Sequence, residues 1–168
     1  MASGEPVVQI LDVMPTATVY ATMDTRAGGS TPAEAVMMWD FDTSTTEYVD
    51  FKCVLDGYDG GGLTFTIPYS ASSATSGVCR WAIAIRAMVD DAEDIDGAHT
   101  YDYNAVDDTT ASATGELSYP TLAFTDGADM DSWANGQVAI VRIRRDVASA
   151  NDTMAGDAEL WGLIGRET

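Results

Sequence analysis

Apolar and polar side chains alternate along several short segments of this chain, each bounded by Gly, Asp, Ser or Thr. Residues 63–69 are the clearest case, with Leu, Phe, Ile and Tyr at the odd positions and Thr, Thr and Pro at the even ones. A period of two is typical of a β-strand with one buried face. Pro68 is expected near the end of this strand or on a sheet edge, because proline cannot donate a hydrogen bond to a neighbouring strand.

The same alternation predicts strands over residues 47–55 and 77–88. It places Cys53 and Cys79 on inward faces and Arg80, Ala82, Ala84 and Arg86 on an outward face. Further strands are predicted over residues 7–11, 17–23, 35–41, 116–125, 137–147 and 159–165. No segment has the pattern of an amphipathic helix of three turns. The sequence therefore predicts an all-β protein, a single jelly-roll-like β-sandwich of about eight or nine antiparallel strands.

No internal repeat or break in composition divides the chain, so residues 17–168 are predicted to form one sandwich domain. Residues 1–16, which include Pro15, are predicted to extend from it as an N-terminal arm. Such an arm could add a strand to a neighbouring subunit. Its apolar anchors would be Val7, Val8, Ile10 and Leu11. On this interpretation, deleting residues 1–14 leaves a folded domain that no longer binds its partner. The alternation fades over residues 90–114, which are predicted to be a functional or mobile surface loop.

The chain carries 27 acidic and 8 basic residues, a net charge of −19. This excess argues against nucleic acid and anionic membranes as partners, because phosphate groups are bound by Lys and Arg. No apolar run approaches the roughly 18 residues of a membrane span, and the N-terminus lacks the basic start and apolar stretch of a secretory signal. Most acids are Asp in segments between strands. They are compatible with solvation in a salty medium, docking on a basic partner, or clustered metal binding.

The residues offer little support for catalysis. His99 is the sole histidine, it lies in the unpatterned segment, and no Gly-x-Ser-x-Gly motif occurs. It is interpreted as an exposed loop residue. Paired carboxylates for glycoside hydrolysis are uninformative among so many acids. A sugar-binding groove would use exposed aromatic side chains on loops. The available ones are Tyr58, Tyr101, Tyr103 and Trp133.

A calcium site was considered at Asp91, Asp94 and Asp96, which precede Gly97 as in half of a calcium loop. Aligning Gly97 with the glycine of an EF-hand puts alanine at the first ligand position and tyrosine where the bidentate Glu belongs. The EF-hand interpretation therefore fails. An irregular oxygen-ligand site at this segment, or at Asp56 and Asp59, remains open, and no other metal or cofactor is predicted.

Two further groups allow alternatives. Cys53 and Cys79 are predicted to be buried thiols, although neighbouring strands would also permit a disulfide. Arg142, Arg144 and Arg145 crowd one late strand. They are predicted to pair with Asp on adjacent strands, with a subunit interface at Arg142 and Arg144 as the alternative.

Several segments together resemble a family of β-sandwich virion proteins of tailed bacteriophages. They are Trp39-Asp-Phe-Asp, Glu47-Tyr-Val-Asp-Phe, Asp56-Gly-Tyr-Asp-Gly-Gly-Gly-Leu-Thr-Phe-Thr-Ile, Thr75-Ser-Gly-Val-Cys-Arg-Trp, Val141-Arg-Ile-Arg-Arg-Asp and Asn151-Asp-Thr-Met-Ala-Gly-Asp-Ala-Glu-Leu-Trp-Gly. They occur in the expected order over roughly the last three-quarters of the chain, and their order is more informative than any single segment.

The resemblance implies a jelly-roll-like sandwich that assembles, commonly as a trimer, on the outside of a virion. It implies a head decoration (cement) protein that stabilises the capsid exterior, is made in the host cytoplasm, and binds the major capsid protein and copies of itself. The alternative within the resemblance is a tail fibre, a spike or another receptor-binding, carbohydrate-binding module. No catalytic residues are implied. A glycoside-acting enzyme and a calcium-dependent adhesion domain are the competing classes.

Overall fold

A computed structural model describes residues 4–168 and confirms the all-β, antiparallel architecture. The described residues form twelve strands and one short 3₁₀ turn, η1 (Ala128–Met130). The strands are β1 (Val8–Pro15), β2 (Thr22–Ala27), β3 (Ala35–Phe41), β4 (Tyr48–Leu55), β5 (Leu63–Thr66), β6 (Tyr69–Ala71), β7 (Val78–Met88), β8 (Asn104–Thr109), β9 (Thr121–Phe124), β10 (Val138–Arg145), β11 (Ala158–Leu160) and β12 (Ile164–Glu167).

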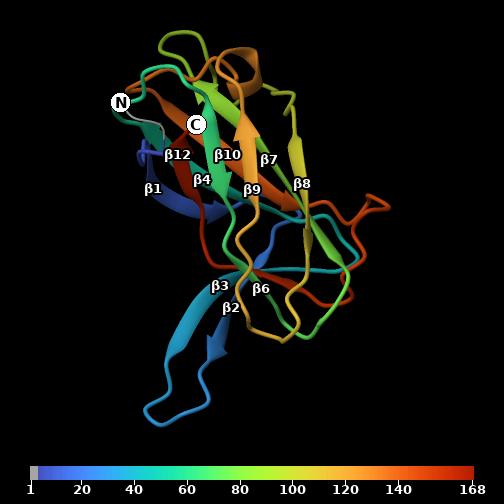
Figure 1. Ribbon diagram of the computed structural model, residues 1–168. Helices are drawn as coiled ribbons and strands as arrows, with labels where there is room; N and C mark the ends of the chain where they lie inside the picture. Colours follow the sequence, from blue (N-terminus) through green and yellow to red (C-terminus); the bar gives the residue numbers. More distant parts are fainter. Residues whose placement is uncertain (1–3) are drawn as a thin grey trace.

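The strands form two layers (Figure 1). One layer is a five-stranded sheet in the order β1-β4-β10-β7-β8. The other is built from a four-stranded sheet, β2-β3-β11-β6, and a three-stranded sheet, β12-β5-β9. The β2–β3 hairpin projects from one end of the molecule, and η1 lies at the opposite end (Figure 1). Among the described residues, no helix has the length and apolar character needed to cross a membrane.

The alternation seen in the sequence places the core between the layers. Every second residue of β4 and β10 is buried. Trp81 of β7 packs edge-on against Phe41 of β3 and Tyr69 of β6, with ring centroids 5.1 and 5.4 Å apart. These three aromatic side chains join the five-stranded and four-stranded sheets, since aromatic pairs in this geometry add to the stabilisation from burial.

Both cysteines are free and buried, as predicted. Cys53 is on β4 and Cys79 on β7, and β10 lies between these strands, so the condition for a disulfide is not met. Burial raises the pKa of the Cys53 thiol to about 12.

The segment predicted as one strand over residues 63–69 is two strands, with Pro68 at the break. β5 lies in the three-stranded sheet and β6 in the four-stranded one. Residues 159–165 divide in the same way into β11 and β12, and the Trp161 N–H donates to the Pro68 carbonyl at 2.9 Å. Because β11 pairs with β6 and β12 with β5, the two small sheets form one layer bent at Pro68.

The N-terminal segment corrects the predicted arm. Its first three residues lie outside the described part of the chain, but β1 is an edge strand paired with β4 of the same sheet. Val7 is fully buried. Just before it, Gly4 donates to the Glu167 carbonyl at 2.8 Å, so the two ends of the described chain are hydrogen-bonded together. Deleting residues 1–14 would therefore remove part of the core and one sheet edge, rather than a detachable extension.

Residues 90–103, part of the predicted surface loop, pack on the outer face of the five-stranded sheet. Arg86 is buried there, where its guanidinium donates to Glu93 Oε1 at 2.6 Å and to the Asp94 carbonyl at 2.6 Å. Ala82 and Ala84, predicted to face outward, are fully buried on the same strand. The chain then continues into β8, a strand that the polar sequence did not predict.

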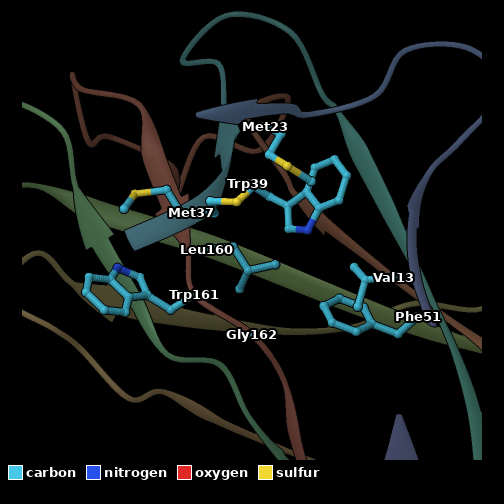
Figure 2. A pocket seen from close by; sticks show the side chains of 9 residues that line it. Val13, Met23, Met37, Trp39, Phe51, Leu160, Trp161 and Gly162 are labelled. Atoms are coloured by element: carbon cyan, nitrogen blue, oxygen red, sulfur yellow. The ribbon is translucent and has the colours of Figure 1, made fainter. Parts of the chain in front are cut away.

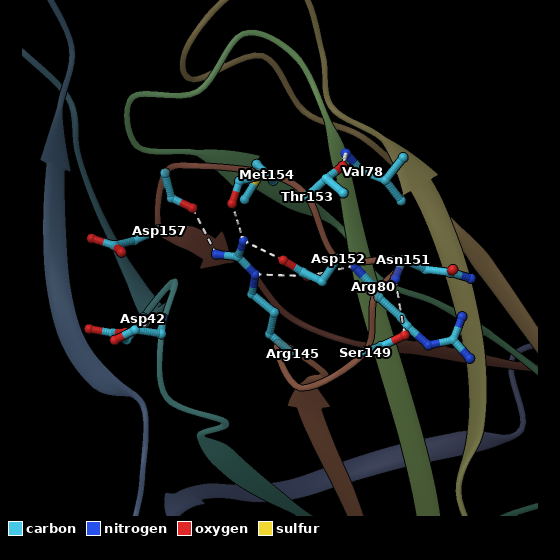
Figure 3. Close-up of polar contacts among 12 residues, drawn as sticks. Asp42, Val78, Arg80, Arg145, Ser149, Asn151, Asp152, Thr153, Met154 and Asp157 are labelled. Atoms are coloured by element: carbon cyan, nitrogen blue, oxygen red, sulfur yellow. Dashed lines mark hydrogen bonds and ion pairs between the residues drawn. The ribbon is translucent and has the colours of Figure 1, made fainter.

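The loop after β10 is fixed by a buried arginine (Figure 3). Arg145 donates through Nε and Nη2 to the Asp152 carboxylate at 3.0 and 2.8 Å, and to the carbonyls of Met154 and Gly156 at 2.5 and 2.7 Å. Asp152 also accepts the Arg80 N–H at 2.9 Å. Burial alone would lower the pKa of Arg145, but the hydrogen bonds and charge of Asp152 outweigh it and raise that pKa. Three of the segments that carry the virion resemblance, containing Arg80, Arg145 and Asp152, thus meet in one polar network.

Candidate functional site

The most exposed apolar surface lies on the β2–β3 hairpin. Met37 and Met23 are 64% and 54% exposed. Met23 faces Trp39 across the hairpin. Together with Val13 of β1 and Leu160 of β11 these side chains surround an apolar cleft of about 100 Å³ (Figure 2). We refer to this region as the hairpin cleft.

The exposure of the hairpin cleft follows from strand parity. Phe41, Trp39 and Met37 lie on one face of β3, because side chains two apart share a face. Phe41 is fully buried against Trp81, Trp39 is partly buried, and Met37 is largely exposed. The core-facing side of β3 therefore continues beyond the sandwich, where the hairpin projects from the body (Figure 1). Within the described part of the chain, Met23 and Met37 on this side remain largely exposed.

Carboxylates crowd the sheet next to this hairpin. A polar hollow there is lined by Thr22, Asp40, Asp42, Glu47 and Asp157. Burial, followed by the charges of Asp157 and Glu159, raises the pKa of Asp40 to about 6. In contrast, the charge of Glu159 is balanced by Arg26, whose Nη1 lies 2.5 Å from Glu159 Oε2. The uncompensated carboxylates make this side of the molecule complementary to positive charge.

The arginines considered for an interface are engaged within the chain. Arg142 makes two hydrogen bonds to Asp50, both of 2.7 Å, and its guanidinium lies 4.1 Å from the ring centre of Tyr101. Arg144 lies 4.1 Å from the ring centre of Tyr103. For Arg142, the pair with Asp50 of β4 is the intramolecular pairing predicted from the sequence, to which the subunit interface was the alternative. His99 packs beside Tyr101 and is mostly buried, so its interpretation as an exposed loop residue is wrong.

The other predicted contact residues divide by burial. Val7 is inaccessible and Val8 packs against the core, whereas Ile10 and Leu11 on the edge strand β1 are exposed. Only the last two remain available to a partner.

The predicted calcium ligands do not gather at one point. Asp94 Oδ1 accepts the Asp96 N–H at 2.9 Å, and the carbonyl of Asp94 binds Arg86. Asp91 occupies a separate turn with a positive φ of 55°. In the described part of the chain, no group of three or more acidic, His or Cys side chains is arranged to hold a metal ion. This loop is organised around a guanidinium.

A second hollow, of about 380 Å³, is lined by loops that lie at the end of the molecule opposite the projecting β2–β3 hairpin (Figure 1). Its lining comes from the β4–β5 and β9–β10 connections and comprises Tyr58, Asp59, Gly60, Asp126, Gly127, Ser132, Trp133, Ala134 and Asn135. Two of the four aromatic residues considered for sugar contact, Tyr58 and Trp133, are thus brought together, but as buried walls rather than exposed platforms. We refer to this hollow as the loop pocket.

No protein-family model matches the chain, and no curated protein matches it in sequence. Among solved structures, the carbohydrate-binding module TmCBM61, determined with β-1,4-galactotriose, aligns over 94% of this chain and 88% of its own, with 11% identity and a TM-score of 0.39. The enzymatically active domain of tailspike protein 4 from bacteriophage CBA120 aligns over 92% of this chain and 19% of its own, with 11% identity and a TM-score of 0.42. Because both TM-scores lie below 0.5, we transfer nothing from either protein to this chain.

Sequence reasoning located neither surface, although it named Tyr58 and Trp133 of the loop pocket among the candidate sugar contacts. The alternation identified the inward face of residues 35–41. The point at which this strand extends beyond the sheet that covers it depends on tertiary packing. For the loop pocket, the available signal was the recurrence of Gly with Asp and an aromatic residue in residues 56–62 and 126–136. That composition indicates turns, and only the fold brings the turns together.

Proposed function

We propose that this chain is a non-enzymatic structural protein of a tailed-phage virion, attached to another protein of the particle through the hairpin cleft. The observation that carries the proposal is the uncovered continuation of the core-facing side of β2 and β3, with Met37 64% exposed. Contiguous apolar surface of this kind marks interaction sites in soluble proteins. The segments that resemble virion proteins supply the virion context.

The proposed occupant of the cleft is a protein surface with an apolar centre and a rim of Lys and Arg. Charge complementarity supports this partner over a second copy, because each copy carries −19 charges and has uncompensated carboxylates beside the hairpin. A head decoration protein seated on the major capsid protein fits this arrangement. The trimer implied by the resemblance remains a prediction. Self-association through the hairpin cleft would contradict the proposal that the cleft binds a different protein.

A tail fibre, spike or other receptor-facing component is the second candidate, and one observation favours it. The loops that line the loop pocket lie at the end opposite the hairpin (Figure 1). If the hairpin is attached to the particle, the loop pocket faces away from the particle.

The test compares wild-type protein with a Met23→Asp/Met37→Asp variant in binding to phage particles from which the protein has been removed. We expect apparent affinity to fall at least about tenfold, because a buried interface would have to accommodate two charges. Both changes are at exposed positions, so the melting temperature should be preserved. The matched control is Ile95→Asp, a change at an exposed apolar residue on another loop. Full occupancy by the double variant, or a wild-type trimer in sedimentation that the same changes dissociate, would contradict the proposal.

A further inference from the structure

The loop pocket has the size and lining of a small-ligand site. Its volume of about 380 Å³ lies within the roughly 300–1,000 Å³ of typical ligand pockets. Tyr58 and Trp133 form apolar walls, and side chains of Asp126, Ser132 and Asn135 contribute polar groups around them. A pocket with aromatic walls and a few convergent polar groups is the usual form of a binding site.

The walls of the pocket are held in place by their own hydrogen bonds. Tyr58 donates from its hydroxyl to Asp126 at 2.6 Å, and its backbone N–H donates to Asn135 Oδ1 at 3.0 Å. Trp133 Nε1 donates to the Gln137 carbonyl at 2.8 Å. These contacts fix both rings and both polar side chains before any ligand arrives, which lowers the entropy cost of binding.

The backbone beside the pocket is strained. Asp131 and Ser132 are consecutive non-glycine residues with φ of 52° and 56°. Each such residue costs free energy that the surrounding structure must offset, and such residues cluster at ligand sites. The Ala87 N–H donates to Asp131 Oδ2 at 2.9 Å, so the strained turn is tied to β7.

The polar residues that line the pocket carry both donors and acceptors. Within the described part of the chain, Asn135 Nδ2, the Ser132 hydroxyl and the second oxygen of Asp126 make no hydrogen bond. An amide N–H₂ donates, a carboxylate accepts, and a hydroxyl does both. A sugar hydroxyl can satisfy all three kinds of group, whereas a cation needs acceptors alone and an anion would be repelled by Asp126.

From this combination we propose that the loop pocket binds a neutral saccharide, with Asn135 and Ser132 donating to sugar hydroxyls and Asp126 accepting from one. The inference names a ligand class for the receptor-facing candidate and does not require attachment through the hairpin cleft. A failed sugar titration would therefore leave the hairpin proposal intact.

The experiment is an NMR titration of the full ¹⁵N-labelled chain with glucose, galactose, rhamnose and N-acetylglucosamine separately. At least one sugar should shift the Trp133 indole N–H and the amides of residues 131–135 saturably. Asn135→Ala should weaken that binding by about fivefold, the value of one or two hydrogen bonds. Asn151→Ala, at an exposed asparagine on a different loop, should leave it unchanged.

A second variant separates binding from folding. Ser132→Gly removes the hydroxyl and also relieves the positive φ, so it should weaken sugar binding severalfold while raising the melting temperature. A purely structural role for Ser132 would not lower affinity while stability rises. The saccharide assignment would be overturned if none of the four sugars gave a saturable shift, or if Asn135→Ala bound sugar as well as wild type does. Lysine amide serves as a cationic probe, and a response of the same signals to this probe alone would also overturn the assignment.

Discussion

The Arg145–Asp152 pair is predicted to be the most sensitive polar contact in the molecule. The two side chains are 0% and 4% exposed. In Asp152→Asn, the amide oxygen can keep the bonds from Arg145 Nε and from the Arg80 N–H, but the new N–H₂ then faces the Nη2 donor. The guanidinium would be left buried without a counter-charge, which costs about 3–5 kcal/mol.

This loss is measurable as a change in melting temperature. For a chain of 168 residues, each kcal/mol corresponds to about 2–4 °C, so we expect a decrease of about 6–20 °C. Urea unfolding followed by tryptophan fluorescence gives the free energy directly. The control is Asp12→Asn, which removes an exposed pair with Lys52 at 3.7 Å and should change stability by less than about 0.5 kcal/mol.

A double variant tests the physical reason. Arg145→Met with Asp152→Leu removes both charges, so it should destabilise less than Arg145→Met alone, which leaves a buried carboxylate. If Asp152→Asn costs under about 1 kcal/mol, the buried pair does not fix the loop after β10, and the reasoning is refuted.

Two further predictions concern titration and the outer cover of the sheet. Because burial raises the pKa of Asp40 to about 6, the folded state binds its proton more tightly than the unfolded chain; the contribution of Asp40 to unfolding free energy therefore falls as pH rises from its ordinary value near 3.8 to about 6. As pH rises across this window, the melting temperature of Asp40→Asn should therefore increase relative to that of wild type, and parallel curves would contradict the shift. Tyr101→Ala removes the stacking on Arg142, so it should cost about 1–2 kcal/mol and expose residues 90–103 to limited proteolysis. Tyr119→Ala, at an exposed tyrosine, should do neither, and an unchanged cleavage rate in Tyr101→Ala would show that other contacts hold the segment.

Local pattern was sufficient for the central strands and insufficient wherever a segment depends on a distant partner. The predicted boundaries of β4, β7 and β10 agree with the structure to within a few residues, and β4 and β10 also show the predicted alternation of burial. β8 was missed because an edge strand with the sequence Asn-Ala-Val-Asp-Asp-Thr has no apolar face to reveal it.

The predicted arm failed for the related reason that apolar residues at a chain end fit an extension and an edge strand equally well. Val7 shows which applies, because its burial depends on the other strands. The covering segment over residues 90–103 was unpredictable from hydrophobicity, since stacked arginine and tyrosine side chains hold it. The two candidate surfaces depend on relative strand lengths and loop convergence, which no local pattern encodes.

The backbone hydrogen bonds that join Gly4 and Glu5 to Glu167 have a practical consequence for engineering. Both ends of the described chain lie together, away from the projecting hairpin (Figure 1). A short linker could connect them, and new termini could be opened at the exposed hairpin tip over residues 28–34, as circular permutation favours such sites. In the unpermuted chain, cargo fused at either end would leave from the side remote from the hairpin cleft. A fusion at either end would therefore leave the hairpin cleft accessible to the partner proposed for it.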